Sequence, residues 1–130
     1  MNKKSLLIVV AVIELATGIA LLIAPSVVAG LLLGATLDYP AAIVVGRVAG
    51  AALLAIGLIC WLQREIGRGA AQTGLLVGLL VYNAAVPIDL AYTAQLDGTR
   101  AIGLWPAVVL HSLLAIWCGA SLLRAPRAGS

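Results

Sequence analysis

The sequence predicts an all-α integral membrane protein, a bundle of four transmembrane helices with the N- and C-termini on the cytoplasmic side. Of its 130 residues, 63% are hydrophobic and only 10% are charged, and the mean hydropathy is +1.14. A soluble domain has about 45–50% apolar and about 25% charged residues. A domain of this length also leaves much of its surface exposed, so we expect the excess apolar surface to face a lipid bilayer.

Four long apolar stretches divide the chain. A spanning helix needs about 20 residues, so residues 1–130 form one transmembrane domain without room for a separate soluble domain. The predicted helices cover residues 5–24, 41–62, 70–92 and 101–123. Pro25 ends the first helix because proline lacks a backbone donor and clashes with the preceding turn. Residues 26–34 then either lie along the outer interface or continue the first helix at an angle.

The Lys and Arg residues predict the orientation. One side carries Lys3, Lys4, Arg64, Arg68, Arg124 and Arg127, whereas only Arg100 lies in a loop on the other side. Cytoplasmic loops carry the excess of Lys and Arg, which predicts a multi-pass protein of the bacterial inner (plasma) membrane. These basic residues form no stripe with interleaved aromatics, so the sequence does not predict nucleic-acid binding.

Two pairs of glycines have the spacing that lets membrane helices approach closely. Gly46 and Gly50 form one GxxxG pattern, and Gly74 and Gly78 form another. Such residues pack helices together where lipid supplies no hydrophobic driving force. Packing inside the bundle and contact between copies in a homo-oligomer are both compatible with the pattern.

Each predicted helix carries one strongly polar residue at depth, namely Glu14, Arg47, Asn83 or His111. A charged residue at a helix centre costs about 2.5–3.5 kcal/mol on insertion scales, so these residues are expected to find partners. We predict an ion pair between Glu14 and Arg47, with Asn83 and His111 hydrogen-bonded nearby and Thr17 able to join.

This polar layer has two interpretations. It is structural if it fixes which helices pair, because removing one partner of a buried ion pair is strongly destabilising. It is a proton or ion site if Glu14 and His111 exchange protons, since intramembrane ionisable groups often mark such pathways. An adjacent Arg47 would favour the charged carboxylate and thus argues against a proton carrier.

The sequence predicts neither an enzyme nor a cofactor or metal site. Cys60 and Cys118 form no CxxC pair, and we expect them to behave as small apolar residues. His111 is the only histidine, and no GxSxG, HExxH or P-loop motif occurs.

The first half of the chain carries a pattern made of Glu14, Gly18, Pro25, the LLLG of residues 31–34, the GRVAG of residues 46–50 and the ALLAIGL of residues 52–58. With this pattern the chain resembles small bacterial four-helix membrane proteins of the broad DoxX-like group. The resemblance implies a four-helix bundle and no mechanism. Glu14 in AVIELATG is also similar in position to the proton-coupling glutamate of small multidrug-resistance transporters. The chain differs from those transporters in having an intramembrane arginine, Arg47, and in lacking phenylalanine.

These observations favour a non-enzymatic accessory or scaffold subunit, or a homo-oligomer, with a buried polar layer. The expected partners are the lipid bilayer and either further copies of the chain or a larger membrane complex. The alternative is a small proton-coupled transporter or ion pathway that uses Glu14 and His111.

Overall fold

The computed structural model describes residues 2–67 and 69–124, and all regular structure within them is helical. The helices are α1 (Lys3–Ile23), α2 (Pro25–Leu33), α3 (Pro40–Gln63), α4 (Ala70–Asp97) and α5 (Leu104–Leu123). Within this part of the chain, α1, α3, α4 and α5 are long and apolar enough to cross a membrane. The predicted all-α fold with four membrane-spanning helices is confirmed. The orientation of the termini stays a prediction, and Arg68 and Arg127 lie outside the described residues.

Helix boundaries differ most from the sequence prediction on either side of the loop between α4 and α5. Helix α4 continues to Asp97, five residues past its predicted end, because no glycine or proline interrupts residues 88–97. It ends where Gly98 takes up the left-handed backbone (φ 65°), which is a common helix C-terminus. Helix α5 starts at Leu104 instead of residue 101, and the N–H of the preceding Gly103 donates to the carbonyl of Leu31 (2.8 Å).

Residues 25–33 form a separate short helix instead of a bent continuation of α1. Ala24 has φ −139° and ψ 62°, which breaks the helical backbone, and Pro25 is the first residue of α2. Proline is favoured at that position because its missing N–H would have no helical partner there. The chain therefore changes direction at Ala24, and α2 lies outside the line of α1.

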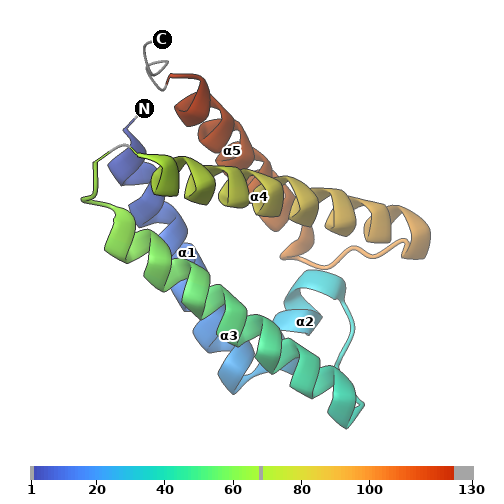
Figure 1. The fold of residues 1–130 in the computed structure, drawn as a ribbon. Coiled ribbons are helices and arrows are strands. Elements are labelled where there is room, and N and C mark those ends of the chain that lie inside the picture. The colour runs from blue at the N-terminus through green and yellow to red at the C-terminus, as the bar shows by residue number, and fades with distance from the viewer. Residues whose placement is uncertain (1, 68, 125–130) are drawn as a thin grey trace.

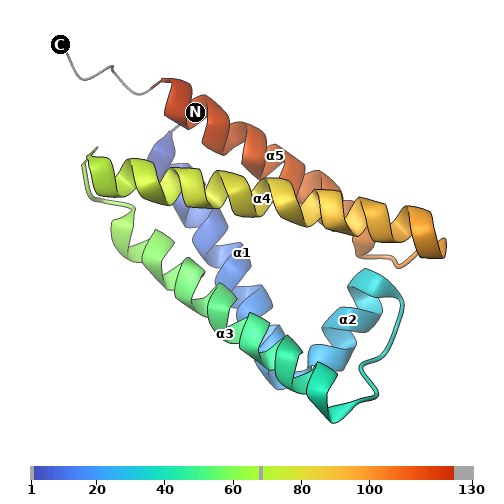
Figure 2. The same ribbon diagram turned by 45° about the vertical axis from the view of Figure 1, so that its right-hand side comes forward.

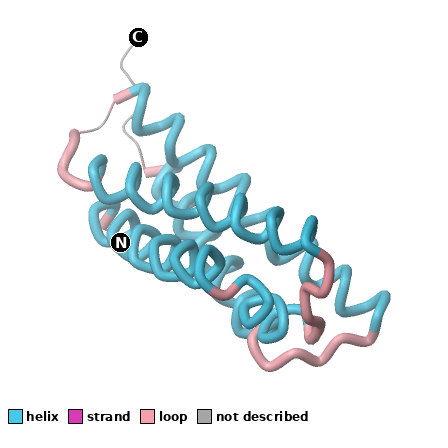
Figure 3. Tube along the Cα trace, turned by 90° about the horizontal axis from the view of Figure 1, so that it is seen from below, coloured by secondary structure: helices cyan, strands magenta, loops and turns pink. Residues whose placement is uncertain are grey.

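The spanning helices form two antiparallel pairs, α1 with α3 and α4 with α5 (Figure 1). The pairs meet near the start of α1 and diverge toward the opposite end, where α2 lies between them (Figure 2). The loops gather at these two ends (Figure 3). We call them the closed end, which holds the start of α1 and the end of α3, and the open end, which holds α2.

A cluster of buried apolar side chains from α1, α3, α4 and α5 joins the two pairs at the closed end. It consists of Leu6, Leu7, Val10, Ala11, Cys60, Leu76, Leu79, Leu114 and Cys118. Both cysteines are thus part of the core.

Polar contacts surround the start of α1 at the closed end. The Lys3 ammonium donates to the carbonyl of Ile66 (2.8 Å) and to the side chain of Gln72. Lys4 forms an ion pair with Glu65 (2.7 Å), and its hydrogen bond lowers the pKa of the exposed Glu65 carboxyl below the ordinary value. These contacts link α1 to the loop between α3 and α4.

Helices α1 and α3 approach so closely that three glycines lie in their interface. A Cβ atom on Gly18 would lie 2.8 Å from the carbonyl oxygen of Gly50, and one on Gly50 would lie 2.8 Å from that of Gly18. A Cβ on Gly57 would lie 2.8 Å from Leu15 Cγ. We call Gly18, Gly50 and Gly57 the glycine contact.

The two GxxxG patterns have different surroundings. A Cβ on Gly46 would lie 2.9 Å from Pro25 Cβ, so Gly46 and Gly50 both pack inside the bundle. A Cβ on Gly74 or Gly78 would meet nothing within 4 Å. Packing inside the bundle therefore does not account for the second pattern.

We expect Gly50→Ala to lower the free energy of unfolding by about 1–3 kcal/mol, the usual cost of overpacking a close contact. Gly78→Ala is the matched control. It fills open space and should be neutral or stabilise by up to about 1 kcal/mol through helix propensity. Reversible unfolding in mixed detergent micelles measures both. Equal effects of the two substitutions would contradict the close approach of α1 and α3.

Candidate functional site

Glu14 is a carboxyl group buried in the middle of α1, with 1% of its surface exposed. Its Oε2 atom accepts a hydrogen bond from the hydroxyl of Tyr82 on α4 (3.3 Å). Its Oε1 atom is buried and has no hydrogen-bond partner within the described residues. One half of the carboxyl group is therefore unsatisfied, which is unusual for a buried polar atom.

The polar contacts continue from Tyr82 to α5. The ring of His111 meets the ring of Tyr82 edge-on, with centroids 5.6 Å apart. The Nδ1 atom of His111 lies 2.9 Å from Asn83 Oδ1, while Asn83 Nδ2 donates to the carbonyl of Leu79 (2.8 Å). We call Glu14, Tyr82, Asn83 and His111 the polar layer, which links α1, α4 and α5.

The predicted ion pair between Glu14 and Arg47 is wrong. Arg47 is exposed on α3 and forms no ion pair within residues 2–67 and 69–124. The register of the α1–α3 pair explains this, because Gly57 packs at Leu15 whereas Gly46 packs at Pro25. Arg47 therefore lies about 10–15 Å nearer the open end than Glu14, at 1.5 Å per helical residue.

Of the other residues predicted to form the layer, the structure brings two together and leaves one out. Asn83 and His111 are brought together, as the sequence predicts that they lie near one another. Thr17 is half-buried, and in the part of the chain described here its hydroxyl forms no hydrogen bond with the polar layer.

Sequence reasoning missed Tyr82, the residue that connects Glu14 to His111. The available signal was its position. Tyrosine in membrane helices is enriched at the two interfaces, whereas Tyr82 follows the start of α4 by twelve residues, or about 18 Å. A buried tyrosine hydroxyl usually has a hydrogen-bond partner, and Glu14 supplies it.

The polar layer contains hydrogen-bonding groups, and in the part of the chain that the structure describes no Lys or Arg forms an ion pair with the Glu14 carboxyl group. An ionised carboxylate at this depth is costly without such a partner. Among the described residues, no three His, Cys, Asp or Glu side chains are grouped so as to hold a metal ion.

A groove runs beside the polar layer between α3 and α4. It has a volume of about 350 Å³, and Gly74, Gly78 and Tyr82 from α4 line it together with Ile56 and Ile59 from α3. The glycines without packing contacts thus keep this groove open, and Tyr82 belongs both to the groove and to the polar layer.

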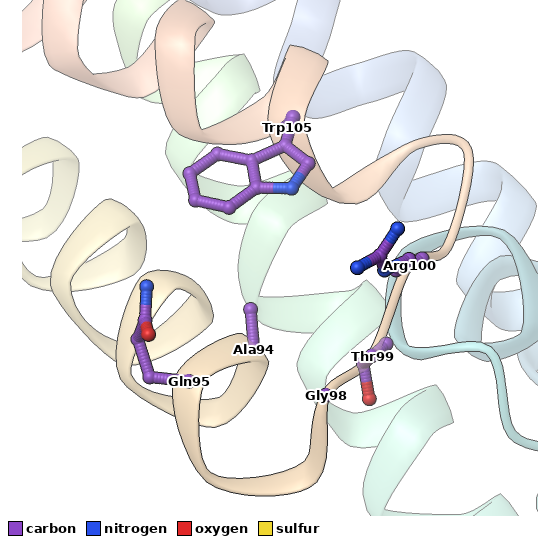
Figure 4. Close-up of a pocket in the computed structure, with 6 residues that line it drawn as sticks. All are labelled: Ala94, Gln95, Gly98, Thr99, Arg100 and Trp105. Carbon is purple, nitrogen blue, oxygen red and sulfur yellow. The ribbon is translucent and has the colours of Figure 1, made fainter.

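A second hollow, of about 510 Å³, lies at the open end where α4 meets α5. Gln95 lies near the end of α4, while Arg100 and Trp105 come from the loop and from the start of α5 (Figure 4). Tryptophan and arginine at a helix end suit the level of the lipid head groups. This hollow is separate from the polar layer.

No protein-family model, curated protein or solved structure matches the chain. The resemblance to the DoxX-like group stays a prediction that rests on the sequence pattern in residues 14–58.

We expect the effects of Glu14→Gln and Arg47→Met on stability to add within about 0.5 kcal/mol, because the two residues are not in contact. Glu14→Gln and Tyr82→Phe should instead be coupled by about 0.5–3 kcal/mol, the range for residues in one hydrogen-bond network. Unfolding of the single and double variants in detergent measures both cycles. Strong coupling to Arg47 with additivity at Tyr82 would contradict the structure.

Proposed function

We propose that the protein is a small membrane transporter or ion pathway in which Glu14 is the proton-binding group. The observation that carries this proposal is the buried carboxyl group, which within residues 2–67 and 69–124 has one unpartnered oxygen and no ion pair with a cation. Ionisable groups at this depth are expensive, and in membrane proteins they usually belong to substrate or proton pathways.

The position of Arg47 supports the proposal. An arginine beside Glu14 would hold the carboxylate in its charged form, and that was the main argument against proton exchange. With Arg47 exposed elsewhere on α3, Glu14 is hydrogen-bonded to the hydroxyl of Tyr82, and the Tyr82 ring in turn contacts the ring of His111. These groups can donate and accept hydrogen bonds while a proton is gained or lost.

A second candidate function is a non-enzymatic accessory or scaffold subunit, alone as a homo-oligomer or within a larger membrane complex. The observation that favours it is the exposed GxxxG pattern at Gly74 and Gly78, where an added Cβ atom would meet nothing within 4 Å among the described residues. Small residues of this kind let a helix of another chain approach closely. Under this function, the polar layer only fixes the positions of α1, α4 and α5.

For both functions we propose that the protein lies in the bacterial inner membrane with its termini in the cytoplasm. Lys3, Lys4 and Arg64 lie at the closed end, which would therefore be the cytoplasmic end under the positive-inside rule. The open end, with α2, would then face the outside. We propose no catalytic role for any residue.

We expect the carboxyl group of Glu14 to change its protonation state as the pH is varied with the protein folded in lipid. Infrared difference spectroscopy on nanodiscs detects the C=O band of a protonated carboxyl group. A titrating band that is lost in Glu14→Gln but retained in Asp38→Asn, a carboxylate in the exposed loop at the open end, would support proton binding.

The stability of the same variants separates the two candidate functions. If Glu14→Gln removes the titrating band and lowers the thermal unfolding temperature no more than Tyr82→Phe does, the carboxyl group serves proton binding. A Glu14 band that does not respond to pH, together with a large loss of stability in Glu14→Gln, would favour the scaffold.

A further inference from the structure

A cavity of about 460 Å³ lies at the open end, where the two helix pairs diverge. Its walls come from α1, α2, α3, α4 and the loop before α3, including Leu21, Val28, Leu32 and Val45. Ligand sites in proteins have volumes of about 300–1,000 Å³, are mostly apolar and carry a few polar groups that orient the ligand. This cavity has the size and the lining of such a site.

Among the described residues that line the cavity, Asp89 supplies the only charge. It lies eight residues before the end of α4, about 12 Å along the helix. Within the described chain it forms no ion pair, and Arg47, which lies on α3 next to the cavity residue Gly46, does not reach it. The Asp89 side chain is exposed, so the cationic group of a ligand that enters the cavity can reach its carboxylate.

We propose that this cavity binds an amphipathic amine, with its ammonium group at Asp89 and its apolar body between α2 and α3. The charge selects a cation over an anion, and the apolar walls select an alkyl or ring body over a polar one. The proposal does not depend on Glu14, which belongs to the polar layer and does not line this cavity.

Two sources provide this ligand chemistry, a freely diffusing lipophilic amine and the ethanolamine head group of a membrane lipid. They share an ammonium group joined to an apolar chain. They differ in whether the ligand must be added or is already present in the bilayer.

The test is an NMR titration of the protein in phosphatidylcholine nanodiscs, with methyl-labelled valine and leucine. Octylammonium should shift the methyl signals of Val28, Leu32 and Val45 in a saturable manner, whereas octanol and octanoate, with the same chain length, should not. Asp89→Asn should weaken octylammonium binding about tenfold or more, as expected when a charge-assisted hydrogen bond is lost. Ala42→Leu, which fills the cavity from α3, should abolish binding.

Asp38→Asn is the matched control, because it removes an exposed carboxylate that does not line the cavity. Unchanged methyl signals of Leu6 and Leu7 in the core show that each variant is folded. The proposal is overturned if octanol binds as tightly as octylammonium, or if Asp89→Asn binds octylammonium with unchanged affinity.

Replacing part of the phosphatidylcholine by phosphatidylethanolamine identifies the source. If this lipid alone shifts the cavity signals in an Asp89-dependent manner, the occupant is the lipid amine. If it leaves the affinity for octylammonium unchanged, the cavity serves a free amine.

Discussion

The close approach of α1 and α3 at Gly18, Gly50 and Gly57 determines where the polar side chains of α1 lie. Backbone atoms meet at this contact, so neither the register nor the rotation of the pair can change without a clash. Gly18 is directed at α3, and Glu14 lies four residues earlier on α1 and reaches Tyr82 on α4. The glycine contact fixes α1 against α3, and the apolar cluster at the closed end holds this pair against α4, which carries Tyr82.

The sequence predicts the elements better than their contacts. Apolar length and composition are enough to locate four spanning helices, because a bilayer demands about 20 apolar residues for each. The end of α4 was less predictable, since residues 93–97 are polar enough for a loop yet contain no residue that stops a helix before Gly98. The sequence could not show that Glu14 and Arg47 are not partners, because the cost of a charge at depth indicates that it needs a partner but not which residue lies opposite it. That depends on the register of α1 against α3, which the backbone contact of Gly18 with Gly50 determines.

Helix α2 explains why the molecule is closed at one end and open at the other. Pro25, its first residue, packs against Gly46 of α3, and Leu31 near its end accepts a hydrogen bond from Gly103 before α5. The helix therefore contacts both pairs and occupies the space between them. The cavity lined by Asp89 exists because nine residues of helix cannot fill the whole gap between the diverging pairs.

This asymmetry gives the two candidate functions different physical requirements. The apolar cluster at the closed end lies between Glu14 and that end of the membrane, and its largest members, such as Leu6 and Leu7, are fully buried. In this arrangement a proton reaches Glu14 without crossing the cluster only from the open end or from the groove beside Tyr82. A carrier must also expose the group to the other side, so the contacts between the α1–α3 pair and the α4–α5 pair would have to separate at the closed end. Those contacts are apolar side chains and the hydrogen bonds of Lys3, whereas α1 and α3 meet backbone to backbone at the glycine contact. A scaffold has no such requirement, and motion between the pairs is therefore the property by which a transporter of this fold differs from a scaffold.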